Sequence, residues 1–499
     1  MINSNELSKN ISQLVDYGVR TSLIAITDIE NYVNAYANLL KTPLEYIDGM
    51  YEKPLVEILK VLDEYAVDSQ ILPYDSQMVR DNFETKIMAV MTPSHDEVNL
   101  EFVKLLKHNS IDATDYYYQM NIANNYIRMD RVRKDERWVY NSSFGDIDIS
   151  INLSKPEKDP KDIANIVEKT NTNEPKCLLC KENEGFAGNN NYFSKENLRL
   201  IDINLSGEHW YLQYSPYVYY NEHCIVLGSE HTPMKISKST FRNLLDFLDI
   251  FPHYFLGSNA DLPIVGGSIL NHNHYQGGRY EFALQRAKEL YSFTFAKYPT
   301  IKAAVVNWPM SVIRMSSNDK EAMIECSNAI LNQWIDYSDE SVNILAYTNN
   351  TRHNTITPIA RMNNGEYQLD LVLRNNRTTS EYPLGIFHPH QELHHIKKEN
   401  IGLIEVMGLA ILPGRLKTEL ARCREYLLLG TKSNEIEKHL PWLEEIKLNN
   451  SLIDESNVDN ILKDAVGETF ALVLKDAGVF KLDESGSKAF KKFVEIISQ

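Results

Sequence analysis

The chain has 499 residues, of which 43% are hydrophobic, so it is long enough for roughly two to four domains with substantial cores. Its 51 Lys and Arg against 68 Asp and Glu give a formal net charge of -17, which argues against nucleic acid or an anionic membrane as the main partner. No apolar run approaches about 18 residues and the N-terminus is polar, so we expect a cytoplasmic protein. Its five cysteines are too few and too unevenly spaced for a disulfide framework.

Residues 1–140 are predicted to form a helical region. After Pro93, Ser94 and Glu97 stand at the spacing of a capping box, followed by apolar residues at helical spacing. The region has no cluster of His or Cys and no Gly-rich loop, which favours a role in packing or assembly. The run of three tyrosines at 116–118 is expected on a helix face rather than as a base-stacking platform, because no basic residues alternate with it.

The pattern changes to strands mixed with helices in residues 141–300. Alternating apolar residues from Gly145 predict a strand, and Pro160 is typical of the first turn of a helix that would run through Ile166. Further strands are expected at 210–214 and 223–227, and a helix at 241–251. Residues 301–499 repeat this mixture, with a strand at 367–373 and helices after Ile401.

The stretch 267–278 (GSILNHNHYQGG) is rich in residues capable of chemistry. In an extended chain His272, His274 and Gln276 would point to the same face, because side chains alternate along a strand. Glycines at both ends leave room for a ligand or another backbone to approach. This is the layout of an imidazole nucleophile with polar helpers. The alternative is a strand whose histidines are satisfied surface groups.

Cys177 and Cys180 form a CxxC pair. Two thiolates at this spacing can occupy adjacent corners of a zinc tetrahedron, so the pair predicts half of a metal site. A redox pair is the alternative, but the polar loop after it does not resemble the strand–CxxC–helix arrangement of redox proteins. His231 and His272 are the candidates for the other two ligands, although spacing alone assigns neither.

A third cluster lies further along, where His388, His390, His394 and His395 fall within eight residues. Such a cluster could bind metal, could hold a sugar phosphate with neighbouring lysines, or could be a solvated loop. Basic residues close to it in sequence favour anion binding, since guanidinium groups bind phosphate in a bidentate manner. The candidates for contacts with a phosphorylated substrate are Arg374, Arg377, Lys397 and Lys398.

Several longer stretches resemble a known family. They are Asn152–Pro160 (NLSKPEKDP), Gln213–His223 (QYSPYVYYNEH) and the segment from His394 through Arg415, which contains HHIKKEN and LPGR. With the CxxC pair, the segment around His231 and the His-rich stretch, they make nearly the whole chain similar to the galactose-1-phosphate uridylyltransferases, a branch of the histidine-triad superfamily. The long stretches resemble the second, bacterial type of that family.

The resemblance implies an α+β fold with two histidine-triad-like units whose sheets are antiparallel, at residues 141–300 and 301–499, plus the N-terminal helical region. It implies that His274 is the nucleophile and that the Gln276 amide binds the transferred phosphoryl group. It also implies that Cys177, Cys180, His231 and His272 bind a structural zinc ion. No organic cofactor is expected.

The activity implied by the resemblance is transfer of the uridylyl group from UDP-glucose to galactose 1-phosphate, through a covalent intermediate on His274. UDP-glucose and galactose 1-phosphate are thus the expected partners, without nucleic acid or membrane, and a homodimer is left open. Two departures stand out: Asn273 replaces the Pro of the better-known first type, and His353-Asn354-Thr355 lacks the second His of that type's other metal site. A hydrolase or phosphorylase of dinucleoside polyphosphates and a non-catalytic zinc-stabilised assembly protein remain as alternatives.

Overall fold

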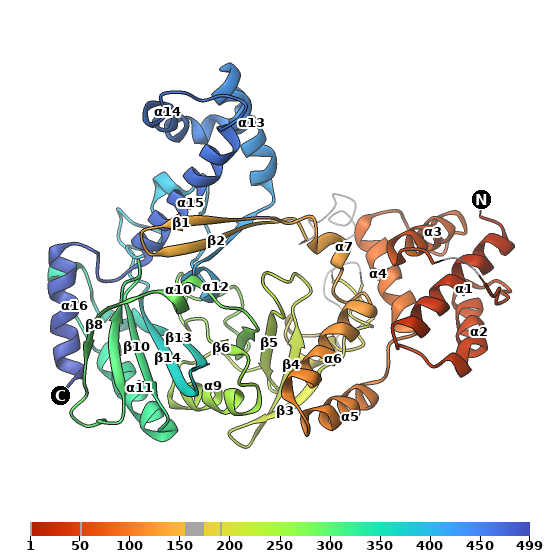
Figure 1. The fold of residues 1–499 in the computed structure, drawn as a ribbon, viewed down its shortest axis with the longest axis horizontal. Helices are drawn as coiled ribbons and strands as arrows, with labels where there is room; N and C mark the ends of the chain where they lie inside the picture. The colour runs from red at the N-terminus through yellow and green to blue at the C-terminus, as the bar shows by residue number, and fades with distance from the viewer. Residues whose placement is uncertain (1, 50–51, 155–173, 190–191) are drawn as a thin grey trace.

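The structure is a computed structural model that describes residues 2–49, 52–154, 174–189 and 192–499 (Figure 1). The helix expected after Pro160 lies outside the described residues. None of the helices in the described part is both long and apolar enough to span a membrane.

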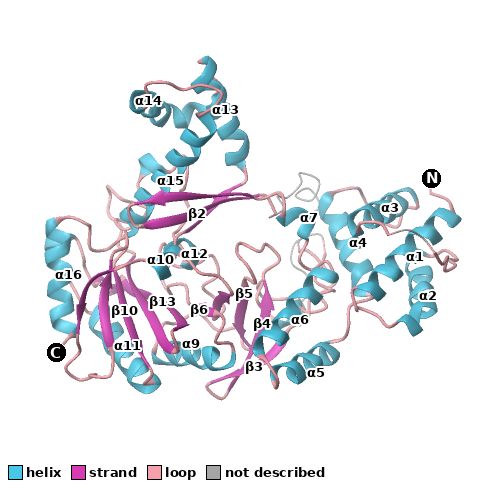
Figure 2. Cartoon of the chain, viewed as in Figure 1, coloured by secondary structure: helices cyan, strands magenta, loops and turns pink. Residues whose placement is uncertain are grey.

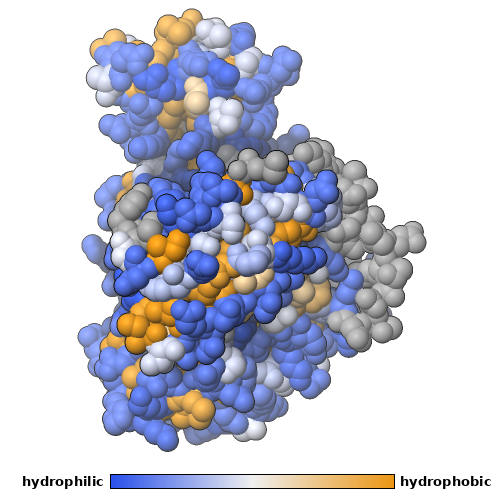
Figure 3. Space-filling view, turned by 90° about the vertical axis from the view of Figure 1, so that its right-hand side faces the viewer, coloured by the Kyte–Doolittle hydropathy of each residue, from blue (hydrophilic) through white to orange (hydrophobic). Residues whose placement is uncertain are grey.

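Helices make up the N-terminal region as far as residue 132, at the right of Figure 1. The capping box is confirmed, since the Ser94 side chain accepts from the Glu97 backbone N–H and the Glu97 carboxylate accepts from the Ser94 backbone N–H. Figure 3 shows this side of the molecule as largely hydrophilic, with apolar side chains gathered in patches across its middle. The helices are α1 (Ser4–Arg20), α2 (Ile29–Leu40), α3 (Leu55–Asp68), α4 (Gln77–Ala89), α5 (His95–Leu106), α6 (Ser110–Ala123) and α7 (Met129–Val132), with the 3-10 turn η1 (Ile26–Asp28).

The expectation for the tyrosine run is confirmed: Tyr117 lies on α6, fully buried against the rest of the protein. Its ring stacks on that of Tyr214 with centroids 5.0 Å apart, and its hydroxyl donates to the Arg199 carbonyl oxygen. An aromatic pair of this kind adds about 0.5–1.5 kcal/mol beyond the area that it buries. Helix α6 therefore packs against β4, and α5 contacts β3.

One sheet of ten strands forms the centre of the molecule, and every pair in it is antiparallel. Its two five-stranded halves meet where β6 pairs with β13. The α+β fold with antiparallel sheets is thus confirmed. In spatial order the strands are β3 (Ile201–Leu205), β4 (Glu208–Tyr214), β5 (Cys224–Gly228), β7 (His274–Gly278), β6 (Phe255–Gly257), β13 (Asn354–Asn363), β14 (Glu366–Asn375), β10 (Val312–Ser317), β9 (Lys302–Val306) and β8 (Glu289–Phe293).

The two faces of this sheet are covered differently. Val226, Tyr275 and Leu371 point to one face, where they join a large apolar core beneath α9 (Lys238–Ile250) and α11 (Lys320–Ile335). The register places His274 and Gln276 on the opposite face, because each alternates with Tyr275 along β7. The chemically capable residues of β7 therefore point away from the helix-covered core.

A three-stranded sheet and C-terminal helices pack on that opposite face (Figure 2). Here β1 (Glu136–Ser142) and β2 (Gly145–Asn152) form a hairpin, and β15 (Leu409–Pro413) pairs with β2 in parallel. The further elements are α10 (Ala283–Arg286), α12 (Leu403–Val406), α13 (Arg415–Leu429), α14 (Leu440–Asn449), α15 (Val458–Ala477) and α16 (Glu484–Ile497), with the hairpin strands β11 (Tyr347–Thr348) and β12 (Thr351–Arg352) and the 3-10 turns η2 (Lys181–Asn183), η3 (Glu340–Val342), η4 (Gln391–Leu393) and η5 (Asn434–His439).

The region limits expected from sequence stay predictions. Strand pairings cross both of them: β1 begins before residue 140 and pairs with β2, while β2, β6 and β8 lie before residue 300 and pair with β15, β13 and β9. Because strand pairing joins segments across both limits, any cut there would separate hydrogen-bonded neighbours.

Candidate active site and metal site

The two cysteines of the CxxC pair and the two candidate histidines come together in space. Their four ligand atoms all lie within 4.8 Å of one another. The Cys177 Sγ is 3.6 Å from the Cys180 Sγ and 3.3 Å from Nδ1 of His272, and the Cys180 Sγ is 3.1 Å from Nδ1 of His231. The corners of a zinc tetrahedron with N and S ligands are about 3.3–3.8 Å apart, so the cluster has the size that such an ion needs.

The imidazole of His272 is also oriented as a metal ligand. Its Nε2–H donates to the Gly228 carbonyl oxygen at 2.9 Å, which leaves the lone pair of Nδ1 directed at the two sulfur atoms. A backbone carbonyl behind a ligating histidine is the usual second contact in metal sites. The four residues can therefore hold a metal ion, and they connect the end of β5 to the start of β7.

His274 is the first residue of β7 and is buried, with 5% of its surface exposed. Its Nδ1 lies 2.8 Å from the His272 carbonyl oxygen. A carbonyl oxygen can only accept, so Nδ1 carries the proton and Nε2 keeps a lone pair. Burial lowers the pKa of His274 to about 4, against the opposing effect of this hydrogen bond, so the imidazole is neutral at neutral pH.

The glycines after His274 allow close backbone contact, as expected. A Cβ on Gly277 would lie 2.4 Å from the Phe255 carbonyl oxygen, and one on Gly278 would lie 2.6 Å from that of Glu222. Gly278 also has a φ of 149°, which L side chains rarely adopt. Larger residues at these two positions would push the neighbouring strand away from β7.

The His-rich stretch is shorter as a strand than its sequence indicates. The strand begins at His274, so His272 lies in the preceding loop and turns to the cysteines. His274 and Gln276 do share a face, and the Gln276 Oε1 lies 3.2 Å from Nε2 of His223. The stretch thus divides between two sites, a metal-ligand cluster and a candidate catalytic face.

Arg374, at the end of β14, is on the same sheet face as His274 and Gln276 by register. Its guanidinium is 1% exposed and donates to the Ile401 carbonyl oxygen at 2.8 Å and to the Thr357 hydroxyl at 3.3 Å. Its Nε has no partner, and within the described residues no carboxylate pairs with it. Burial lowers the pKa of Arg374 to about 10, partly offset by the charge of Glu405. A buried cation without an ion pair in the described part of the chain is suited to an anionic ligand.

The other three basic candidates lie in different settings. Lys397 is buried and pairs with Glu405 at 2.8 Å, Arg377 is partly buried and donates to the Asn343 carbonyl oxygen, and Lys398 is exposed. Their contacts with substrate remain predictions.

The four histidines of the third cluster do not converge on one point. His388 and His394 each contact the Pro389 carbonyl oxygen, His390 faces Asp476, and His395 contacts His439. They do not form a four-histidine metal site. In the described part of the chain, only two groups could hold a metal: the Cys/His cluster, and His390 with Glu392 and Asp476. His353 belongs to neither.

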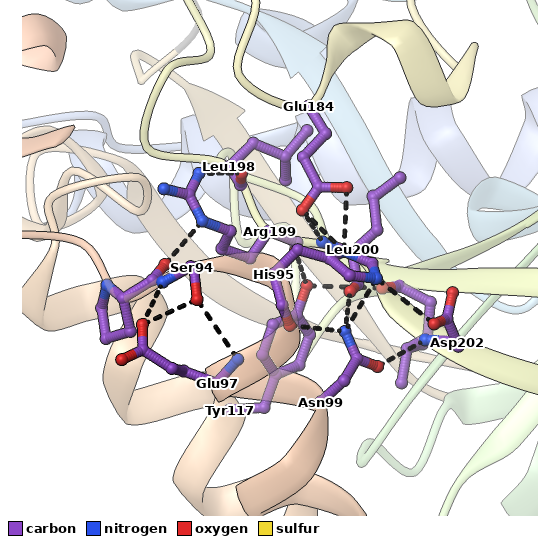
Figure 4. A network of polar contacts seen from close by, with 12 residues as sticks. Ser94, His95, Glu97, Asn99, Tyr117, Glu184, Leu198, Arg199, Leu200 and Asp202 are labelled. Carbon is purple, nitrogen blue, oxygen red and sulfur yellow. Dashed lines mark hydrogen bonds and ion pairs between the residues drawn. The ribbon is translucent and has the colours of Figure 1, made fainter.

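A polar network not anticipated from the sequence joins the helical region to the segment after the cysteines (Figure 4). His95, the first residue of α5, has Nδ1 3.0 Å from a Glu184 oxygen and Nε2 3.2 Å from an Asp202 oxygen. Asn99 accepts from the Asp202 backbone N–H. Because carboxylate oxygens only accept, the doubly protonated imidazolium suits this position. Burial lowers the pKa of His95, but the hydrogen bonds and charges of the two carboxylates outweigh it and raise the pKa.

The chain is similar to proteins of known family along most of its length. The N-terminal domain model of galactose-1-phosphate uridyl transferase matches residues 32–233, and its C-terminal domain model matches residues 247–442. The chain is 52% identical over 497 residues to the galactose-1-phosphate uridylyltransferase of Clostridium acetobutylicum, covering 98% of this chain and 100% of that protein. It is 44% identical over 499 residues to that of Bacillus subtilis, covering 98% and 97%.

These matches define the class: the protein is a nucleotidyltransferase. More narrowly, the chain belongs to the galactose-1-phosphate uridylyltransferase family. Among solved structures, yeast Ap4A phosphorylase matches with a TM-score of 0.33 and 12% identity, covering 59% of this chain and 84% of that one. A similarity this distant says nothing about the activity of this chain.

Proposed function

We propose that the chain transfers the uridylyl group of UDP-glucose to galactose 1-phosphate through a covalent intermediate on His274. The orientation of the His274 ring carries the proposal: its Nδ1–H is held by the His272 carbonyl oxygen at 2.8 Å, so Nε2 is the nitrogen free to attack. The names of the full-length relatives support galactose 1-phosphate as a substrate and the uridylyl group as what is transferred.

In the first half-reaction, Nε2 of His274 attacks the α-phosphorus of UDP-glucose. A P–N bond forms while the bond from that phosphorus to the bridging oxygen breaks, and glucose 1-phosphate leaves with the electron pair. In the second, a phosphate oxygen of galactose 1-phosphate attacks the same phosphorus and the P–N bond breaks. UDP-galactose leaves and His274 is free again, so ping-pong kinetics are expected.

Charge on the phosphoryl oxygens needs fixed donors, because the protein as a whole is acidic. The Gln276 amide, on the same strand face as His274, is our candidate at the reacting phosphorus. Arg374 is the strongest candidate for another phosphate, since it is buried, cationic and without an ion pair in the described residues, whereas Arg377, Lys397 and Lys398 have weaker support.

Zinc is the metal that we propose for the Cys/His cluster, because two thiolates and two imidazoles at these separations match its preferred ligands. Cys177, Cys180, His231 and His272 would hold it. A bound zinc ion would fix the backbone around His272, and so the carbonyl oxygen that orients His274, without activating water. The contribution of the chain itself is the hydrogen bond from His274 to that oxygen.

Incubation with UDP-glucose alone, followed by intact mass measurement, tests the proposal. We expect a stable uridylyl-protein and one equivalent of glucose 1-phosphate, and neither from His274→Asn. Continuous release of free nucleotide would instead favour a hydrolase of the dinucleoside polyphosphate type. No reaction at all, from zinc-loaded and folded protein, would favour a non-catalytic assembly role.

A further inference from the structure

His223 lies immediately before β5 and has no role in the mechanism above. Its side chain is buried, with 3% of the residue exposed, and its Nε2 lies 3.2 Å from the Gln276 Oε1. The Nδ1 of the same ring is buried without a hydrogen-bond partner. A buried polar atom without a partner is unfavourable, so the position of this ring needs a physical reason.

The proton of the neutral His223 ring belongs on Nε2, because Nε2 has an acceptor and Nδ1 has none. If Nδ1 carried it, a buried N–H donor would have no acceptor, and such orphan donors are rarer than orphan acceptors. With the proton on Nε2, the ring donates to the oxygen of the Gln276 amide and only a lone pair is left unused. Burial lowers the pKa of His223 to about 4, which keeps the ring neutral at neutral pH.

The neighbours of His223 restrict its ring. The rings of Tyr219 and Tyr220 pack on it, with centroids 5.4 Å and 4.6 Å away. The Tyr220 hydroxyl donates to the Gly277 carbonyl oxygen. The Ser215 backbone N–H donates to the His223 carbonyl oxygen. Two aromatic rings thus pack on the donor, and one of them is hydrogen-bonded to β7, which restricts how far the His223 ring can turn with the Gln276 amide.

A glutamine amide has two nearly equivalent orientations, with its oxygen and its NH2 group exchanged. Here the fixed donor of His223 selects the orientation in which Oε1 faces the ring and the NH2 group faces away. Gln276 is partly exposed, and no hydrogen bond from its NH2 group to a described residue is found. That group is therefore free to donate to a ligand on the face that carries His274.

We propose that His223 is a positioning residue that fixes the Gln276 amide with its NH2 group turned to the phosphoryl group of the bound nucleotide. The inference rests on the proposed function, in which that phosphoryl group meets Gln276. Without the hydrogen bond from His223, both orientations of the Gln276 amide become accessible. In one of them the amide oxygen faces the phosphoryl oxygens, to which it cannot donate.

Single-turnover uridylylation by UDP-glucose tests this with His223→Leu, Gln276→Leu and the double variant, in zinc-loaded protein. Gln276→Leu should slow uridylylation on the order of 10²–10³-fold, as loss of a transition-state donor does. His223→Leu should slow it about 2- to 12-fold, the worth of one net hydrogen bond, with the half-saturating UDP-glucose concentration little changed. In the Gln276→Leu background the same substitution should have no further effect, because the amide that it orients is gone.

A matched control is His253→Leu. It removes a second histidine of lowered pKa, which is partly buried and contacts Ser110 and Thr114. It should uridylylate at the wild-type rate. Where His223→Leu does not fold, His223→Asn replaces it, since its shorter amide cannot reach Gln276 without moving the backbone.

The inference is overturned by a wild-type rate in the folded His223 variant, or by an equal slowing in the presence and absence of Gln276, which would mean a purely structural role. It also falls if Gln276→Leu reacts at the wild-type rate. Failure of the wild-type protein to form any uridylyl-protein would instead contradict the proposed function, so the two failures are separable.

Discussion

Replacing Arg374 by Met should lower activity while leaving stability nearly unchanged. The guanidinium is buried without a carboxylate partner in the described residues, and it makes two neutral contacts, to the Ile401 carbonyl oxygen and the Thr357 hydroxyl. An arginine kept in this state is unfavourable for the fold, because its charge is removed from water without an ion pair. Its presence is better explained by an anionic substrate.

The magnitudes follow from these contacts. Arg374→Met leaves the Ile401 carbonyl oxygen unsatisfied, at a cost of about 1–3 kcal/mol, and relieves a burial penalty of several kcal/mol for the charge. We therefore expect a free energy of unfolding within about 1 kcal/mol of the wild type, or above it. Loss of a charged hydrogen bond to phosphate should lower kcat/KM by about 10- to 150-fold, the equivalent of about 1.5–3 kcal/mol.

The assay measures thermal midpoints and both half-reactions, with Arg314→Met as the control. Arg314 is also buried, but both of its contacts with Asp370, at 2.7 Å and 3.0 Å, are charged. Breaking that pair should destabilise the protein by up to about 3–5 kcal/mol. If Arg374→Met destabilises as much as Arg314→Met and leaves kcat/KM unchanged for both substrates, Arg374 is a structural residue and the reasoning is wrong.

His274→Asn should reduce turnover on the order of several powers of ten without unfolding the protein, because Asn cannot form the phosphoramidate; near-normal turnover in a folded variant would refute the assignment. Purified protein should contain one zinc ion per chain by metal analysis, and Cys177→Ser should lose it and melt at a lower temperature; full zinc occupancy in that variant would count against the site. The His95 contacts with Glu184 and Asp202 predict a pH-dependent stability. Burial lowers the pKa of His95, but the two carboxylates outweigh this effect and raise the pKa above 6.5. The stabilisation by these contacts is therefore complete below pH 6.5 and is lost as the pH rises through the raised pKa. The thermal midpoint of the wild type should exceed that of His95→Gln by more at about pH 6 than at about pH 9, and an equal difference at both would exclude this linkage.

Local patterns in the sequence were enough to predict many elements. The alternation of Ile147, Ile149 and Ile151 marks β2, and the Ser94 capping box marks the start of α5, because each depends only on residues a few positions apart. For the same reason the CxxC pair and the His-rich stretch were recognisable, and the family resemblance rested on continuous stretches of sequence.

Contacts between distant segments were decided by the tertiary structure alone. Spacing could not show that Nδ1 of His272 turns to Cys177, that His223 faces Gln276, or that Arg374 lacks a carboxylate within the described residues. Each depends on strand register and on which loops close beside one another, and a shift of one residue in register would turn every side chain of a strand to the other face. The sequence by itself therefore determined which chemical groups are available, whereas the fold decided which of them meet.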